Sequence, residues 1–188
     1  MIKHALMTAR VVAACLLGGG LFGVANVAAE EQPLIKELRF GVLAHDVDGL
    51  WSGSRREEGI DLNVEMVFGQ PSLKLPLGAL RPNLGASINT SGDTSKVYAG
   101  VLWQIDFESG LFIDLGLGGA IHDGETDTFR PDRKRLGSHL QFRIPIEIGY
   151  SPDGRNRFSI MFDHISNADL ADPNEGLDTL GIRYSYRF

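Results

Sequence analysis

The chain has 188 residues, and its 18 Lys and Arg residues against 24 Asp and Glu residues give a formal net charge of −6 at pH 7. This acidic balance argues against nucleic-acid binding, because a phosphate-binding surface needs an excess of basic side chains. The single cysteine, Cys15, lies in an apolar N-terminal stretch. We therefore expect neither a disulfide nor a thiol nucleophile in the rest of the chain.

Residues 1–29 have the physical form of a secretory signal peptide. Lys3 and Arg10 supply the positive start, residues 11–24 form the apolar core, and the small residues Val27-Ala28-Ala29 precede the cleavage point. The mature protein is then a single domain at residues 30–188. Removing the two basic residues leaves 16 basic and 24 acidic side chains and a net charge of −8.

The stretch Val12-Ala13-Ala14-Cys15 resembles a lipoprotein cleavage box. It lies near the start of the apolar run and leaves almost no hydrophobic segment before it. Ordinary signal cleavage is therefore the favoured interpretation.

After residue 30, short runs alternate apolar and polar residues, which is the pattern of strands with one apolar face. No stretch there approaches 18 consecutive apolar residues, so no transmembrane helix is expected. In the clearest run, Ile60, Leu62 and Val64 alternate with Asp61 and Asn63. In chain order, strands are predicted at residues 36–45, 59–68, 81–90, 96–105, 111–118, 136–150, 158–166 and 178–188.

Residues 70–80 show apolar spacing of three, interrupted by Pro71 and Pro76, and are predicted to be a turn or a short interfacial segment. No helical period of useful length and no domain linker appear. Short turns near residues 70–80, 106–110 and 151–156 alternate with more polar loops, which are expected at residues 46–58, 91–95, 121–136 and 166–177.

An all-β chain with eight strands favours closure into an antiparallel β-barrel. A soluble lipocalin-like barrel would turn its apolar faces inward, whereas an outer-membrane barrel turns them toward lipid. The outer-membrane barrel is favoured because a small barrel can pair alternating charges across its interior, here Asp61, Glu65, Asp114, Arg143 and Glu147. The alternating aromatic end at Tyr184, Tyr186 and Phe188 also resembles the assembly signal of such barrels.

The last two runs bring together side chains that could do chemistry. His164 and Ser166 are two residues apart and so share one strand face, with their Cα atoms about 6–7 Å apart. Asp178 returns on the neighbouring antiparallel strand with the same outward parity, so its carboxylate can reach the imidazole. A serine nucleophile needs a base, and the base needs an orienting acid. We expect Asp178, His164 and Ser166 to form such a chain at the outer rim, on the side that faces lipid.

The sequence His164-Ile165-Ser166-Asn167-Ala168, followed by Asn174-Glu175-Gly176 and an aromatic closing strand, resembles the C-terminal signature of the lipid A 3-O-deacylase (PagL-like) family. Members of that family are eight-stranded outer-membrane esterases. The specific part of the resemblance covers residues 164–188.

The resemblance implies that His164 is the base, that Ser166 is the nucleophile and that Asn167 is the oxyanion candidate, with Asn174 as a second motif residue. The orienting acid of the family is a glutamate, but the ungapped position falls at Asp178. Glu175 is the nearby alternative. Parity favours Asp178, because Glu175 lies in the loop.

The resemblance also implies hydrolysis of the 3-O-linked acyl chain of lipid A in the lipopolysaccharide leaflet, with release of a 3-hydroxy fatty acid and without a metal or other cofactor. His45, His122 and His139 lack metal-ligand spacing, and Trp51 and Trp103 are expected to be interfacial anchors. A non-catalytic structural or adhesive barrel and a lipid-binding barrel remain alternative functions, and a homodimer is left open.

Overall fold

The computed structural model describes residues 33–188, so the expected signal peptide at residues 1–29 lies outside the described residues. Residues 33–188 contain no helix long and apolar enough to cross a membrane. They form one antiparallel sheet with nine strands, which are β1 (Ile35–Ala44), β2 (Ile60–Phe68), β3 (Leu73–Leu75), β4 (Gly78–Asn89), β5 (Lys96–Asp106), β6 (Leu111–His122), β7 (Leu140–Tyr150), β8 (Asn156–Ser166) and β9 (Leu177–Arg187).

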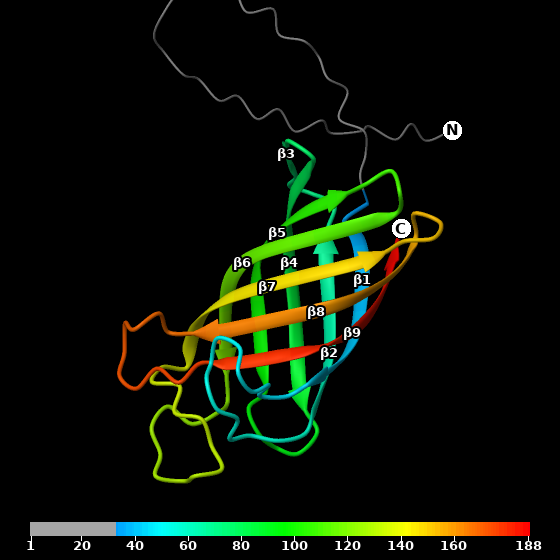
Figure 1. Ribbon diagram of the computed structural model, residues 1–188. Coiled ribbons are helices and arrows are strands. Elements are labelled where there is room, and N and C mark those ends of the chain that lie inside the picture. Colours follow the sequence, from blue (N-terminus) through cyan, green and yellow to red (C-terminus); the bar gives the residue numbers. More distant parts are fainter. Residues whose placement is uncertain (1–32) are drawn as a thin grey trace, which may run out of the picture. The chain divides into compact units, whose positions relative to one another are not determined.

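The sheet closes on itself and forms a barrel (Figure 1). From β4 to β9 each strand pairs with the next one along the chain, β9 pairs with β1, β1 pairs with β2, and β2 pairs with β4. Eight strands therefore make the closed wall, and β3 is a short arm paired only with the start of β4. The prediction of an eight-stranded antiparallel barrel is confirmed.

Several strand predictions need correction. Residues 70–80 are predicted to be a turn or a short interfacial segment, but β3 pairs there with the start of β4 across a turn in which Leu77 has φ 65°. β4 therefore begins at Gly78, three residues before its predicted start. β6 runs on to His122, because Ile121 still pairs with Leu140. β7 begins only at Leu140, because the backbone at residues 136–137 bonds to residues 125–126 within the preceding loop.

Turns and loops separate to the two ends of the barrel (Figure 1). The turns at residues 107–110 and 151–155 lie at the same end as β3 and the C-terminus. The connections at residues 45–59, 90–95, 123–139 and 167–176 lie at the opposite end, which we call the long-loop end. The candidate site described below lies there, at the end of β8.

The outer wall is apolar along its strands. Leu62, Ile160 and Ile182 remain 54%, 61% and 68% exposed, as expected when the apolar side of the strand faces lipid rather than a core. The inner side holds many buried polar residues. Those on the wall strands include five carboxylates and five cations: Glu37, Glu65, Asp114, Glu147, Asp163, Arg39, Lys96, Arg143, Arg157 and Arg183.

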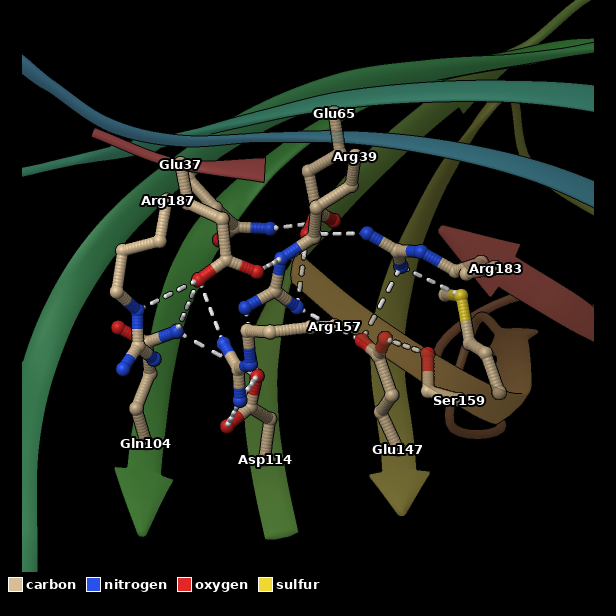
Figure 2. Close-up of polar contacts among 12 residues, drawn as sticks. Glu37, Arg39, Glu65, Gln104, Asp114, Glu147, Arg157, Ser159, Arg183 and Arg187 are labelled. Atoms are coloured by element: carbon tan, nitrogen blue, oxygen red, sulfur yellow. Dashed lines mark hydrogen bonds and ion pairs between the residues drawn. The ribbon is translucent and has the colours of Figure 1, made fainter. Parts of the chain in front are cut away.

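Arg39 is a centre of this interior charge network (Figure 2). Its guanidinium lies 2.8 Å from Glu37, 2.6 Å from Asp114 and 2.7 Å from Glu147. A buried charge is tolerated only when it is paired, because desolvating a lone ion costs several kcal/mol. The network thus explains how the predicted inward charges fill a narrow barrel.

Candidate active site

Three side chains at the end of β8 and the start of β9 form one hydrogen-bonded chain. His164 and Asp178 are direct register partners, and the imidazole Nδ1 lies 2.6 Å from Asp178 Oδ1. The other ring nitrogen, Nε2, lies 3.0 Å from Ser166 Oγ. With Nδ1–H donating to the carboxylate, Nε2 is free to accept the serine proton. This geometry is that of a serine activated by an oriented base.

The three hydrogen-bonded side chains belong to the outward-facing series of their strands, yet two of them are almost completely covered. His164 is only 8% exposed and Asp178 is fully buried, because the loop at residues 45–59 folds against this part of the barrel. The ring of Trp51 meets His164 edge-on, with 5.2 Å between ring centroids, and meets Phe162 at the same distance. Sequence reasoning missed this contact, since a loop has no periodicity that says where it packs.

The second carboxylate oxygen of Asp178 is also held. Oδ2 accepts hydrogen bonds from the backbone N–H groups of Trp51, at 2.6 Å, and Ser52, at 2.8 Å. Both oxygens of the carboxylate are therefore engaged, one by the histidine and one by the loop. The orientation of the acid is fixed from two sides.

Glu175, the alternative acid, has different partners. Its carboxylate lies 3.0 Å from the Arg56 guanidinium and 3.3 Å from that of Arg135, and it accepts the backbone N–H of Arg135 at 2.8 Å. It links three loops rather than reaching the histidine. The geometry favours Asp178 as the partner of His164.

Asn167 holds the segment that follows the serine. Its side-chain amide donates to the carbonyls of Leu136 and Pro173, both at 3.0 Å, and its backbone N–H donates to Asn174 Oδ1 at 3.0 Å. The amide of Asn174 in turn donates to Asp169 Oδ1 at 2.8 Å. Both side-chain hydrogens of Asn167 are thus committed to the loops, so its side chain positions the site and offers no free donor to an oxyanion.

Comparison with known proteins adds the family. A family model described as lipid A 3-O-deacylase (PagL) matches residues 58–187, well over half of the chain. The chain belongs to this PagL family. A curated relative, lipid A deacylase PagL of Bordetella bronchiseptica (strain ATCC BAA-588 / NCTC 13252 / RB50), is 35% identical over 78 residues. That alignment spans 42% of each chain, so it covers less than half of the relative's length.

Solved structures agree on the fold. The crystal structure of the outer membrane enzyme PagL matches with a TM-score of 0.60 at 20% identity, covering 81% of this chain and 99% of that one. Neisserial surface protein A (NspA) matches with a TM-score of 0.54 at 10% identity, covering 85% and 100%. These low identities speak for the barrel alone. Together with membership of the PagL family, the barrel places the protein in the outer membrane.

An apolar groove of about 410 Å³ opens beside the serine of this PagL-family barrel. Phe142 pairs with Gly119 on one side and with Ser166 on the other, so these three residues form a row across the wall. Leu170 and Asn167, from the loop after the serine, also line the groove. At Gly119 a Cβ atom would meet only the Gln141 carbonyl, at 3.7 Å, so the groove is open above this glycine.

A larger groove of about 620 Å³ lies among β1, β2, β8 and β9. None of the three hydrogen-bonded residues lines either groove, but only the smaller one is lined by direct neighbours of Ser166, which are its register partner Phe142 and the next residue, Asn167. Within residues 33–188, no group of His, Cys, Asp and Glu side chains is arranged to hold a metal ion. His45 instead bonds to Asp61 at 2.8 Å and Glu57 at 2.9 Å, and the ring of His122 lies beside that of His139.

Proposed function

We propose that this protein is a serine esterase that hydrolyses the 3-O-linked acyl chain of lipid A and releases a 3-hydroxy fatty acid. The observation that carries the proposal is the continuous chain from Asp178 through His164 to Ser166, with heavy-atom distances of 2.6 and 3.0 Å. Membership of the PagL family supports the choice of substrate.

In the first step, Ser166 Oγ attacks the ester carbonyl while His164 Nε2 takes the hydroxyl proton. Asp178 keeps the imidazole in the required tautomer and stabilises the imidazolium that forms. The tetrahedral intermediate collapses when His164 returns the proton to the departing sugar hydroxyl. A water molecule then attacks the acyl-serine by the same proton transfers in reverse, freeing the fatty acid and the serine.

The oxyanion of the tetrahedral intermediate needs hydrogen-bond donors. Because the side chain of Asn167 is committed to carbonyls, we assign this role to backbone N–H groups of the turn that follows Ser166. Ala168 and Asp169 both adopt positive φ, 55° and 60°, which gives this turn a sharp and unusual course. One well-placed donor of this kind is typically worth about 3–4 kcal/mol.

The groove beside Ser166 supports a lipid substrate. It runs over Gly119 and Phe142 on the outer wall and is lined almost entirely by apolar atoms. An acyl chain of a lipid in the surrounding leaflet could therefore lie against the wall with its ester bond at the serine. The rim position brings the polar head of that lipid level with the loops.

The test is mass spectrometry of lipid A from cells that express the wild type, Ser166→Ala or His164→Ala at matched levels. We expect one 3-hydroxyacyl chain to be lost only with the wild type. A heat-dependent shift on gels would show that both variants still form the barrel. An unchanged lipid A profile with folded wild-type protein, in a host whose lipid A carries the 3-O-acyl chain, would reject the proposal in favour of a non-catalytic barrel.

A further inference from the structure

We infer that the loop at residues 45–59 is a positioning element of the active site, and that the buried side chain of Lys134 holds this loop in place. The inference rests on the proposed function and deepens it. It assigns a task to Trp51, Ser52 and Lys134, which lie outside the motif at residues 164–178.

The loop grips residue 178 at three points. The N–H groups of Trp51 and Ser52 donate to the Asp178 carboxylate at 2.6 and 2.8 Å, and the N–H of Val47 donates to the Asp178 carbonyl at 2.9 Å. An aspartate is one methylene shorter than a glutamate, so it has less freedom to adjust its carboxylate to the imidazole. A clamp that sets the carboxylate plane therefore matters more here than it would for a longer acid.

The same loop also limits access of water to the histidine. The ring of Trp51 packs edge-on against His164, with 5.2 Å between centroids, and the Ser52 hydroxyl lies 3.5 Å from Nδ1. Excluding water strengthens the hydrogen bond between the imidazole and Asp178, because the local dielectric is lower. Orientation and shielding thus come from two consecutive loop residues.

Lys134 holds the part of the loop that contains Ser52. Its ammonium group donates to the carbonyls of Ser52, at 3.0 Å, and Ser54, at 2.8 Å, and it pairs with Asp46 at 3.2 Å. Ser52 is consequently held at both ends, with its N–H on Asp178 and its C=O on Lys134. The lysine side chain is almost fully buried, and a buried ammonium is costly unless it is paired.

The decisive variant removes the clamp without leaving a buried charge. In Asp46→Asn/Lys134→Met the ion pair and the bonds to Ser52 and Ser54 disappear together. The matched control is Arg130→Met/Asp132→Asn. It removes an exposed ion pair, with 3.0 Å between the two charged groups, that lies in the same loop as Lys134. Both double variants change the charge in the same way.

With lipid A in mixed micelles, we expect kcat of the clamp variant to fall by about 10–100-fold, since small misplacements of catalytic groups have effects of this size. KM should change by less than about threefold, because the clamp touches the acid and not the groove. The control should retain wild-type kcat. Wild-type kcat in a folded clamp variant, a rise in KM alone, or an equal loss in the control would overturn the inference.

A second measurement does not depend on turnover. In ¹⁵N-labelled protein, the low-field imidazole proton shared by His164 and Asp178 should be seen in the wild type and in the control, and should be lost or shifted upfield in the clamp variant. An unchanged signal in the clamp variant would overturn the inference. Inactive wild-type protein would reject the proposed esterase, whereas active wild type with an unaffected clamp variant rejects only the role of the loop.

Discussion

The choice of acid depends on a single residue of a strand. Asp178 faces His164 directly across β8 and β9 and reaches Nδ1 at 2.6 Å. Glu175, only three positions earlier, is neutralised by Arg56 and Arg135 in the loops. Removing the charge of a carboxylate that orients an imidazole should therefore change kcat much more than removing the charge of one that links loops.

Replacing Asp178 by Asn should lower kcat by a factor on the order of 10³–10⁴, because an amide favours the wrong imidazole tautomer. Glu175→Gln keeps the shape of the side chain and weakens only partly exposed contacts, so it should lower kcat by less than about fivefold. Release of 3-hydroxy fatty acid from lipid A by the purified variants measures both. A large loss with Glu175→Gln and a small one with Asp178→Asn would reverse the assignment.

The two-residue period of strands explains which site residues were accessible from the sequence. His164, Ser166 and Asp178 share an outward parity with long apolar rows, so their common face followed from alternation alone. Trp51, Ser52 and Lys134 lie in loops whose course is set by contacts distant in sequence, such as the link from Lys134 to Ser52. Nothing in local spacing predicts those contacts. The hydrogen bonds of the Asn167 side-chain amide could not be predicted for the same reason, because its acceptors at residues 136 and 173 lie in two different loops.

At the scale of elements, the strands set the site and the loops complete it. β6, β7 and β8 place Gly119, Phe142 and Ser166 in one row, and the loop after β8 forms the far wall of the groove. A glycine in the outward series of β6, between Leu117 and Ile121, leaves a gap where its neighbours have large side chains. The gap suits an acyl chain that crosses the strand.

Gly119→Leu should fill this gap. The barrel should form normally, since a Cβ atom at this position would make only one ordinary contact, with the Gln141 carbonyl at 3.7 Å. We expect kcat/KM for long 3-O-acyl chains to fall about tenfold or more, and substrates with short chains to be affected less, because loss of apolar contact is worth roughly 0.8 kcal/mol per methylene. Ala86→Leu, on the outward series of β4, is the control. Equal activity of both variants on all chain lengths would exclude the groove as the acyl site.

The cluster around His45 couples the loop at residues 45–59 to pH. Burial alone would lower the pKa of His45, but hydrogen bonds to Asp61 and Glu57 outweigh it and raise the pKa to about 9. Because this lies above the ordinary value of 6.5, the stabilisation is complete below about pH 6.5 and is lost as the pH rises through 9. At 1.36 kcal/mol per pKa unit, the charged imidazole contributes roughly 3 kcal/mol to the free energy of unfolding at low pH.

The free energy of unfolding in urea, measured for lipid-reconstituted protein from pH 6 to 10, should therefore fall more steeply for the wild type than for His45→Gln. The comparison removes contributions from other titrating groups, since both proteins share them. Parallel pH profiles would show that the cluster does not stabilise the folded state through a charged imidazole.

At the scale of the whole molecule, the barrel is a polar interior inside an apolar wall. The sequence predicted this inversion because the inward positions of several strands carry charges, among them Glu65, Asp114 and Arg143. It could not predict the pairings, which join residues far apart in the chain, such as Arg39 with Glu147 at 2.7 Å. These residues become neighbours only when the pairing of β2 with β4 closes the barrel, so the sequence of a single strand does not predict their contacts.

Arg39→Met tests whether this interior network holds the barrel together. The methionine roughly fits the space but leaves Glu37, Asp114 and Glu147 without a shared cation, and breaking a buried pair costs about 3–5 kcal/mol. We expect a loss of stability of that size in urea unfolding. Arg155→Met, in the exposed turn between β7 and β8, should change stability by less than about 0.5 kcal/mol. Equal stability of the two variants would mean that the interior charges are solvated rather than paired.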